Sequence, residues 1–136
     1  MFTDAYDVMV FENHEKILEN FRTFNASVVF GAEYLCMPDP KKANRFPNVK
    51  ACEKRFLNSG GYIGYKKNIK KIISYMIEKY NVKPSESDQK NFQEVYLNGE
   101  MREKHNIKLD HNSTIFFNVY GSADDVEFHC INRSVR

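Results

Sequence analysis

The fold class of this chain is decided by residues 14–32, which read HEKILENFRTFNASVVFGA. From His14 to Phe24, apolar side chains recur at the three- and four-residue spacing of one helix face. These side chains are Ile17, Leu18, Phe21 and Phe24. The next segment, Ser27 to Ala32, has the β-branched and aromatic content typical of a buried strand. A helix followed at once by a buried strand indicates an α/β domain.

The remaining chain continues this mixture of helices and strands. Residues Lys66 to Tyr80 are expected to form the clearest helix, because their apolar side chains follow a period of 3.6 residues. That inward face comprises Ile69, Ile72, Ile73, Met76, Ile77 and Tyr80. Another helix is expected to begin at Ser85 to Gln89, where either serine can accept from the first-turn amides, and to end at Asn98-Gly99. Short strands are expected at 107–109, 114–117 and 126–130.

Prolines and glycines mark two further segments. Three prolines between Cys36 and Pro47 predict a long loop without regular structure. The segment Phe56 to Tyr65 has two apolar ends around Gly60-Gly61, and it therefore predicts a turn between two apolar pieces. Long loops in compact domains often carry function.

Composition limits the classes of partner. The 136 residues suit a single domain, 1–136, with a real core, since 42% of them are hydrophobic. With 20 basic and 18 acidic residues the net charge is only +2, which does not favour a nucleic-acid partner. No apolar run approaches the roughly 20 residues of a membrane span, and the N-terminus lacks a signal pattern. The sequence leaves the cellular location unknown.

Two aspartates near the N-terminus, Asp4 and Asp7, follow a short strand-like segment in the pattern D-x-x-D. Open α/β sheets bind ligands at the carboxyl ends of their strands, so this pair is placed to hold a divalent cation. Mg²⁺ and Mn²⁺ prefer oxygen ligands, and Mn²⁺ also accepts an imidazole, for which His111 is the candidate. The alternative is that the aspartates form only a turn or a helix cap.

Two more sites have both a structural and a functional interpretation. The segment Asn58-Ser59-Gly60-Gly61 is either a turn that needs positive φ or a backbone that approaches a ligand closely. Asp88 is either a first-turn residue favoured by the helix dipole or a carboxylate directed at an acceptor hydroxyl. Spacing alone does not choose between these interpretations.

A resemblance bears on that choice. Seven elements, in order and at matching intervals, resemble the glycosyltransferase domain of procollagen lysyl hydroxylases and the related collagen glucosyl- and galactosyltransferases. They are Phe2-Thr-Asp4-Ala-Tyr-Asp7-Val, Phe30-Gly-Ala-Glu33 with Cys36 and Pro38, Arg55-Phe-Leu-Asn58-Ser-Gly-Gly-Tyr-Ile-Gly64, Asp88-Gln89, Tyr96-Leu97, Leu109-Asp110-His111, and Ile115-Phe116 with Asn118 and Gly121. The similarity extends from about residue 2 to about residue 128.

The resemblance implies a GT-A fold, a Rossmann-related α/β architecture, in which Mn²⁺ or Mg²⁺ grips the diphosphate of a UDP-sugar. Asp4, Asp7 and His111 would be its metal ligands, and Asp88 would orient or deprotonate the acceptor hydroxyl. The substrate-binding candidates are Glu33, Asn58, Ser59, Gly60, Gly61 and Gln89. In this family about the first third of the domain precedes the D-x-x-D turn, so a partial domain without its N-terminal nucleotide-binding strands is expected.

Two functions follow from these expectations. The first is an enzyme that transfers glucose or galactose from a UDP-sugar to hydroxylysine or galactosyl-hydroxylysine of a collagen-like polypeptide. The second is a catalytically incomplete remnant or partial subunit that binds collagen-like protein or a companion chain supplying the nucleotide-binding half.

Overall fold

The computed structural model describes residues 1–5, 8–80, 82 and 87–121. The strands are β1 (Phe2–Thr3), β2 (Val28–Glu33), β3 (Phe56–Gly64) and β4 (Ile107–Asp110). The α-helices are α1 (His14–Thr23), α2 (Lys66–Tyr80), α3 (Asp88–Leu97) and α4 (Gly99–Lys104), and a 3₁₀ helix, η1, covers Pro40–Arg45. The mixed α/β class expected from the sequence is confirmed.

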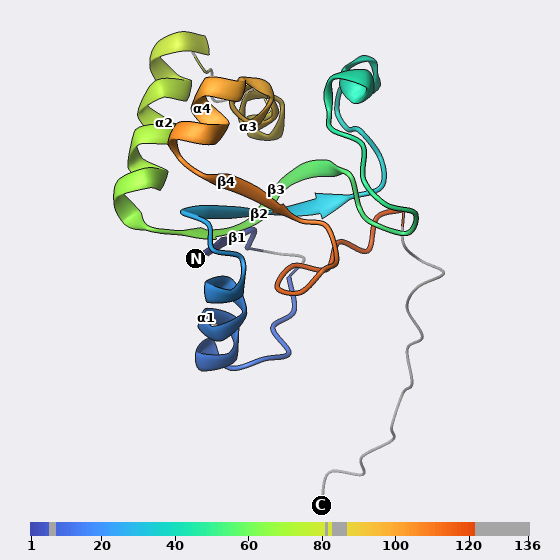
Figure 1. The fold of residues 1–136 in the computed structure, drawn as a ribbon, viewed down its shortest axis with the longest axis vertical. Helices are drawn as coiled ribbons and strands as arrows, with labels where there is room; N and C mark the ends of the chain where they lie inside the picture. Colours follow the sequence, from blue (N-terminus) through green and yellow to red (C-terminus); the bar gives the residue numbers. More distant parts are fainter. Residues whose placement is uncertain (6–7, 81, 83–86, 122–136) are drawn as a thin grey trace, which may run out of the picture.

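The four strands form one mixed sheet in the order β1-β3-β2-β4. Strand β3 runs antiparallel to both of its neighbours, and β4 is parallel to β2. It follows that β1, β2 and β4 all point the same way, so their carboxyl ends lie at one end of the sheet. Helices α2, α3 and α4 cover one face of the sheet and α1 covers the other (Figure 1).

Both faces of β2 are buried, because successive side chains of a strand point to opposite sides. Val28, Phe30 and Ala32 belong to the larger core cluster, under α2 and α3. Val29 belongs to the smaller cluster with Phe21 of α1. This double coverage explains why the strand has no polar alternation in its sequence.

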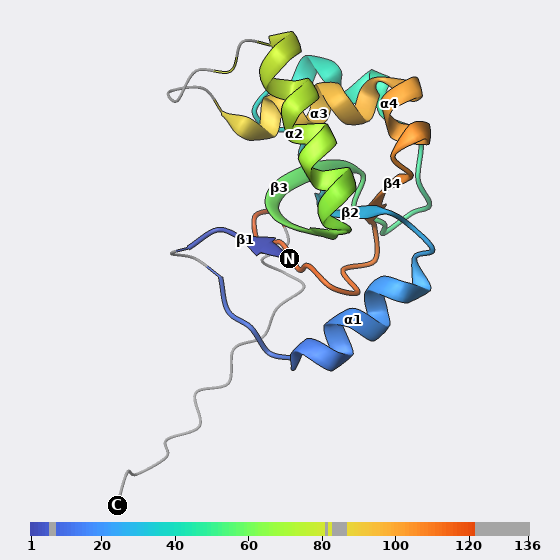
Figure 2. The same ribbon diagram turned by 90° about the vertical axis from the view of Figure 1, so that its left-hand side faces the viewer.

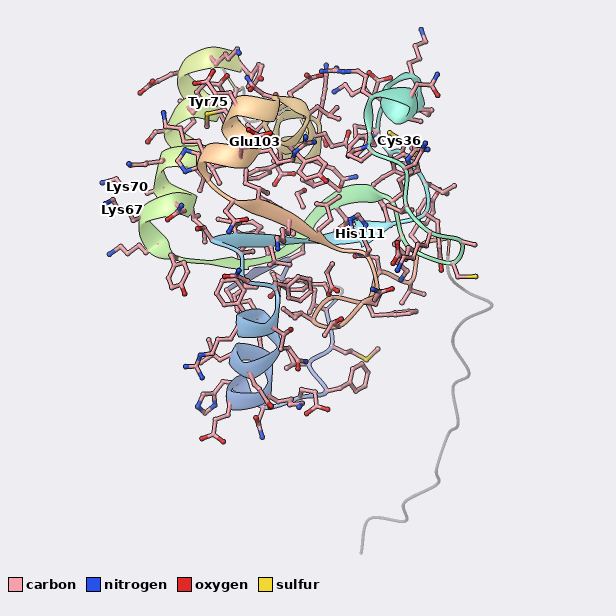
Figure 3. The ribbon with its side chains drawn as sticks, viewed as in Figure 1. Cys36, Lys67, Lys70, Tyr75, Glu103 and His111 are labelled. Carbon is pink, nitrogen blue, oxygen red and sulfur yellow. The ribbon has the colours of Figure 1, made fainter. Side chains whose placement is uncertain are left out.

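Helices α1 and α2 form where the apolar period places them. Asn13 caps α1, accepting a hydrogen bond from the Lys16 amide at 2.9 Å. Ile77 is 55% exposed, so the prediction that it belongs to the inward face of α2 was wrong. Ile77 follows the buried Met76 by one residue, about 100° around the helix axis, so it lies at the edge of the buried stripe. Leu18, on the apolar face of α1, is 42% exposed. Lys67 and Lys70 point away from the sheet, as expected for a solvated helix face (Figure 3).

Three predicted loops or breaks contain regular structure. The proline segment includes η1, which Asp39 caps at the Lys41 amide. Asn98 ends α3 but also caps α4, so a short additional helix follows directly. The turn expected at Gly60-Gly61 is wrong, because both glycines lie inside the nine-residue strand β3.

The expected start of α3 and one of the three strands expected after it are found in the structure. Ser87 is the N-cap of α3, but its side chain makes no capping hydrogen bond. The strand expected at 107–109 is β4, whereas 114–117 contributes only an isolated bridge between Phe117 and Ala32. The expected strand at 126–130 lies outside the described residues. Among the helices that the structure describes, none combines the length and apolarity needed to cross a bilayer.

Candidate functional site

The candidate site lies at the carboxyl ends of the three parallel-pointing strands. Asp4 directly follows β1, Glu33 is the last residue of β2, and His111 directly follows β4. Ligands of open α/β sheets bind at this end, as the sequence interpretation expected of Asp4. The strand β3 enters the sheet at the same end, and it brings Asn58 opposite Gly31 of β2.

A register shift in β3 shapes the middle of this site. Phe30 of β2 pairs with Tyr62, but the next residue, Gly31, pairs with Asn58. Ser59, Gly60 and Gly61 therefore bulge out of the ladder with β2. A bulge of this kind bends the strand and changes the direction of its side chains. Here it turns Ser59 toward the start of α3.

Five of the predicted residues form one connected hydrogen-bond network. Gln89 Nε2 donates to Glu33 Oε1 at 2.7 Å, and Asn58 Nδ2 donates to Glu33 Oε2 at 3.2 Å. The Ser59 amide donates to Gln89 Oε1 at 3.2 Å, and Ser59 Oγ donates to Asp88 Oδ1 at 3.1 Å. The network thereby joins β2, β3 and the first turn of α3.

Glu33 is the buried acid of this network, with only 3% of its surface exposed. Burial raises the pKa of its carboxyl above the usual range, and the hydrogen bonds from Asn58 and Gln89 act in the opposite direction. A buried carboxyl with a shifted pKa beside a cleft is a physical marker of a functional site.

Asp88 is the exposed acid of the network. It is the first residue of α3, where the partial positive charge of the helix end favours a carboxylate. One of its oxygens accepts from Ser59 Oγ, and the side chain remains accessible to solvent. A carboxylate held in this way can accept a hydrogen bond from an incoming hydroxyl group.

Asp4 lies at a cavity of about 540 Å³ that adjoins the network. Its amide donates to the Gly60 carbonyl at 2.9 Å. A Cβ atom on Gly60 would lie 3.0 Å from Asp4 Oδ2, so the carboxylate rests against bare backbone. Other residues of the cavity wall include Asn58, Gly61, Ile115, Phe116 and Asn118. Its volume is within the range of small-ligand sites.

His111 lies elsewhere. Strands β1 and β4 are the two edges of the sheet, as Figure 2 shows. Because neighbouring strands are about 4.8 Å apart, roughly 14 Å separates the backbones of these two edge strands. His111, labelled in Figure 3, is one of the residues that line a separate hollow of about 340 Å³, together with Tyr96 and Arg102. Asp4 and His111 thus line two different hollows of the described residues.

The imidazole of His111 is held by the backbone of the segment that precedes β3. Its Nδ1 lies 2.6 Å from the Lys54 carbonyl oxygen, which can only accept, so Nδ1 carries the hydrogen. Asp7, the remaining predicted ligand, lies outside the described residues. Among residues 1–5, 8–80, 82 and 87–121, no three His, Cys, Asp or Glu side chains are arranged to hold a metal ion.

Two polar residues of the site were missed by the sequence interpretation. Gln93 is fully buried, and its Nε2 donates to the carbonyls of Met37 at 2.7 Å and Leu57 at 3.1 Å. Gln89 donates to the same Met37 carbonyl at 2.7 Å, so the two glutamines hold one loop against β3. Asp110 is also fully buried and accepts from three backbone amides. Gln93 could have been predicted from the sequence, because its i, i+4 spacing from Gln89 places the two side chains on the same face of a helix.

A mixed sheet with acids and amides gathered at the ends of its parallel strands is compatible with a glycosyltransferase domain of the GT-A type. The PLOD GT domain family matches residues 1–136, and the chain belongs to this family. The polar network therefore lies in a domain of the PLOD GT family.

The relatives are procollagen lysine hydroxylases. The chain is 39% identical over 136 residues to procollagen-lysine,2-oxoglutarate 5-dioxygenase 1 of Gallus gallus, and 35% over 136 residues to procollagen-lysine,2-oxoglutarate 5-dioxygenase 2 of Homo sapiens. It is 37% identical over 126 residues to the multifunctional procollagen lysine hydroxylase and glycosyltransferase LH3 of Rattus norvegicus. These matches cover 100%, 100% and 93% of the chain but only 18%, 18% and 16% of the relatives.

Proposed function

We propose that this chain forms part of a GT-A glycosyltransferase that uses a UDP-sugar. The reaction is transfer of glucose or galactose to hydroxylysine or galactosyl-hydroxylysine in a collagen-like polypeptide. Membership of the PLOD GT domain family supports the glycosyltransferase class. The name of the Rattus norvegicus relative joins lysine hydroxylation and glycosyl transfer in one protein, and this supports the collagen acceptor.

The observation that carries the proposal is the network of Glu33, Asn58, Ser59, Asp88 and Gln89 beside the cavity at Asp4. Sugar recognition needs several fixed donors and acceptors, because each sugar hydroxyl both donates and accepts. Here the polar groups come from a strand end, a bulge and a helix start, and all are held by one another. Such mutual support keeps the side chains in place before a substrate arrives.

The two acids of the network have different parts in the proposed reaction. Asp88 orients the acceptor hydroxyl and takes its proton as the new glycosidic bond forms. Glu33, being buried and already hydrogen-bonded through both oxygens, holds Asn58 and Gln89 in position for the sugar. The assignment uses the exposed acid for chemistry and the buried acid for positioning.

A divalent cation, Mn²⁺ or Mg²⁺, is proposed at the aspartates of the D-x-x-D turn. Asp4 suits a hard cation, because its oxygens lie at the cavity wall beside unsubstituted backbone at Gly60. When bound, the cation supplies charge neutralisation for the UDP leaving group. The described geometry does not support His111 as a third ligand, so the proposal depends on Asp4 and Asp7.

The test is transfer from UDP-glucose and UDP-galactose to a hydroxylysine peptide, with and without Mn²⁺. Asp4→Ala and Asp7→Ala should abolish metal-dependent turnover, whereas Asp39→Asn, a carboxylate change at the cap of η1, should not. Equal turnover in the parent chain and in both aspartate variants would refute the metal site. Retained turnover in His111→Ala would assign the ion to the aspartates without the imidazole.

A second function is proposed on a different observation: the apolar residues that follow the D-x-x-D turn are exposed. Val8 is 42% exposed, Met9 and Val10 are each 66% exposed, and Phe11 is 84% exposed. These residues lie near the edge strand β1, whose outer side is not paired in the described sheet. Such a surface suits a companion polypeptide, as a non-catalytic partial subunit would require.

Titration with UDP in the presence of Mn²⁺ separates the two functions. Binding in the micromolar range by this chain would exclude the non-catalytic subunit, because the nucleotide would then need no companion. A chain that is folded but does not bind UDP would favour the subunit.

A further inference from the structure

Asp110, the last residue of β4, holds the loop that follows it. Its side chain is fully buried, with 0% exposure. Asp110 Oδ1 accepts from the Thr114 amide at 2.7 Å, and Oδ2 accepts from the amides of Ile115 at 2.6 Å and Phe116 at 2.8 Å. Three successive backbone donors thus converge on one carboxylate.

The backbone of the loop is arranged for this convergence. Ser113 has φ of 54°, in the left-handed region, and its amide donates to the Asp110 carbonyl at 3.2 Å. The chain thereby turns back on itself and presents the next amides in one direction, as in the concave backbone nests that bind anions. In this loop the anion is supplied by the protein itself.

The segment held by Asp110 forms part of the cavity wall. Ile115, Phe116 and Asn118 all line the cavity at Asp4. The Phe116 ring lies against β3 so closely that a Cβ atom on Gly61 would be 2.5 Å from its Cδ1. Asn118 Nδ2 donates to the Ala32 carbonyl at 2.8 Å, one residue before Glu33. The loop therefore touches both strands that carry the polar network.

An uncharged side chain would not replace the carboxylate. A buried charge is costly unless it is hydrogen-bonded, and here three amides satisfy it. Asparagine has the same shape, but its NH₂ group would face amide donors, leaving at least one of them unsatisfied. The arrangement depends on charge and on acceptor capacity together.

We infer that Asp110 is a positioning residue for substrate binding, acting through the 114–118 loop. This inference rests on the proposed function, because it concerns the same cavity. Asp110 does not reach the cavity itself; it fixes the wall formed by Ile115, Phe116 and Asn118, against which the donor sugar or its acceptor is held.

Amide hydrogen exchange, followed by NMR on the 136-residue chain, tests the structural half of this inference. In the parent chain the amides of Thr114, Ile115 and Phe116 should be protected, although they lie outside helices and strands. In Asp110→Asn their exchange should accelerate by about tenfold or more, whereas Ile72 of α2 should be unchanged. Asp39→Asn is the matched control and should leave the loop amides protected. Unprotected amides in the parent chain would overturn the inference, even if the variant fails to fold.

Kinetics test the functional half. For a positioning residue of the cavity wall, Asp110→Asn should raise KM for the UDP-sugar by about tenfold, with a smaller change in kcat. A merely structural residue would lower the active fraction, and so reduce kcat at constant KM; that result would also overturn the inference. Phe116→Leu leaves the carboxylate intact but alters the same wall, and it should raise KM in the same direction. If the parent chain shows neither turnover nor UDP binding, the proposed function fails, while the exchange result still decides whether Asp110 holds the loop.

Discussion

The glycines of β3 allow one substitution to be compared at neighbouring positions with opposite expectations. In Gly61→Ala, the new methyl group would lie 2.5 Å from Cδ1 and 2.9 Å from Cε1 of the Phe116 ring. In Gly60→Ala, the nearest atoms are the side-chain oxygens of Asn58 and Asp4, each at 3.0 Å. The first methyl meets a packed ring, and the second meets the ends of polar side chains.

The magnitudes follow from what each neighbour can do. To restore ordinary contact, the Phe116 ring must move by about 1 Å away from β3, and overpacking of this kind costs about 1–3 kcal/mol. The Asp4 side chain is exposed, and a contact at 3.0 Å needs to give by only a few tenths of an ångström, so Gly60→Ala should cost less than about 1 kcal/mol. Its main effect should be on the metal-dependent step, since Asp4 is displaced.

Gly99→Ala is the control for the substitution itself. No atom lies within 4 Å of a Cβ at this position, and Gly99 is the first residue of α4. Alanine has the higher helix propensity, so this variant should be more stable than the parent by up to about 1 kcal/mol.

The assay is reversible urea unfolding at 25 °C, followed by circular dichroism, on all three variants and the parent. The expected order of the free energy of unfolding is Gly99→Ala, parent, Gly60→Ala and then Gly61→Ala. If Gly61→Ala is as stable as the parent, the Phe116 ring does not pack on β3, and the reasoning about the cavity wall is refuted.

Three further predictions concern carboxylates. Because burial raises the pKa of Glu33, the folded state binds the proton of this carboxyl more tightly than the unfolded state does. The parent should therefore gain stability relative to Glu33→Gln as the pH falls from 7 toward about 4.5. The measurement is the difference in unfolding free energy between the two proteins. Burial acts to raise the pKa of Glu94, but hydrogen bonds from Arg45 and Lys42 outweigh it, and the pKa is lowered. Glu94→Gln should therefore lower the free energy of unfolding by about 1–3 kcal/mol at pH 7 and by progressively less below pH 4.5. A loss of stability that does not change with pH would contradict this ion pair. Asp88→Asn should lower kcat for transfer by about 100-fold or more with little change in unfolding free energy, and an equal loss of stability would show that the acid has only a structural part.

The elements that sequence could predict are those whose signal is local. Helix α2 was expected at Lys66 to Tyr80 and begins and ends at those residues, because its buried stripe repeats over four turns. Strand β2 was expected from six successive small, β-branched or aromatic residues, and it lies one residue further along, at Val28–Glu33. In both, the residues that specify the element are within the element.

The elements that sequence missed depend on distant contacts. Gly60 and Gly61 have the composition of a turn, but the Gly60 carbonyl accepts from the Asp4 amide, and Gly61 pairs with Thr3 of β1 and lies against Phe116. Each of these partners is more than fifty residues away. Asp110 resembles a turn residue, and its three amide partners become visible only when the following loop is closed. Local preferences are overridden where packing or burial supplies the larger free energy.

Strand order explains the outcome for the predicted site. Glu33, Asn58 and Gln89 meet because β2 and β3 are neighbours under α3, and only the family resemblance had grouped them. Asp4 follows a strand, as expected, and His111 follows a strand that points the same way, but the sequence does not reveal that β1 and β4 are opposite edges of the sheet. A position directly after a strand indicates that a residue lies at the carboxyl end of that strand. It does not indicate which strands lie between two such residues.

The burial of Glu33 is itself an argument about function. If this side chain served only to join β2 to α3, an apolar residue of similar size would do so without the cost of removing a carboxyl from water. Its two oxygens instead accept from Asn58 and Gln89, whose own oxygens accept from the amides of Gly60 and Ser59. Glu33 therefore fixes the bulge that directs Ser59 at Asp88. The result of burying Glu33 is a fixed position for the exposed carboxylate of Asp88. A glutamine at position 33 would keep the size and lose one acceptor, so Glu33→Gln should weaken transfer through the position of Asp88 even where the fold is retained.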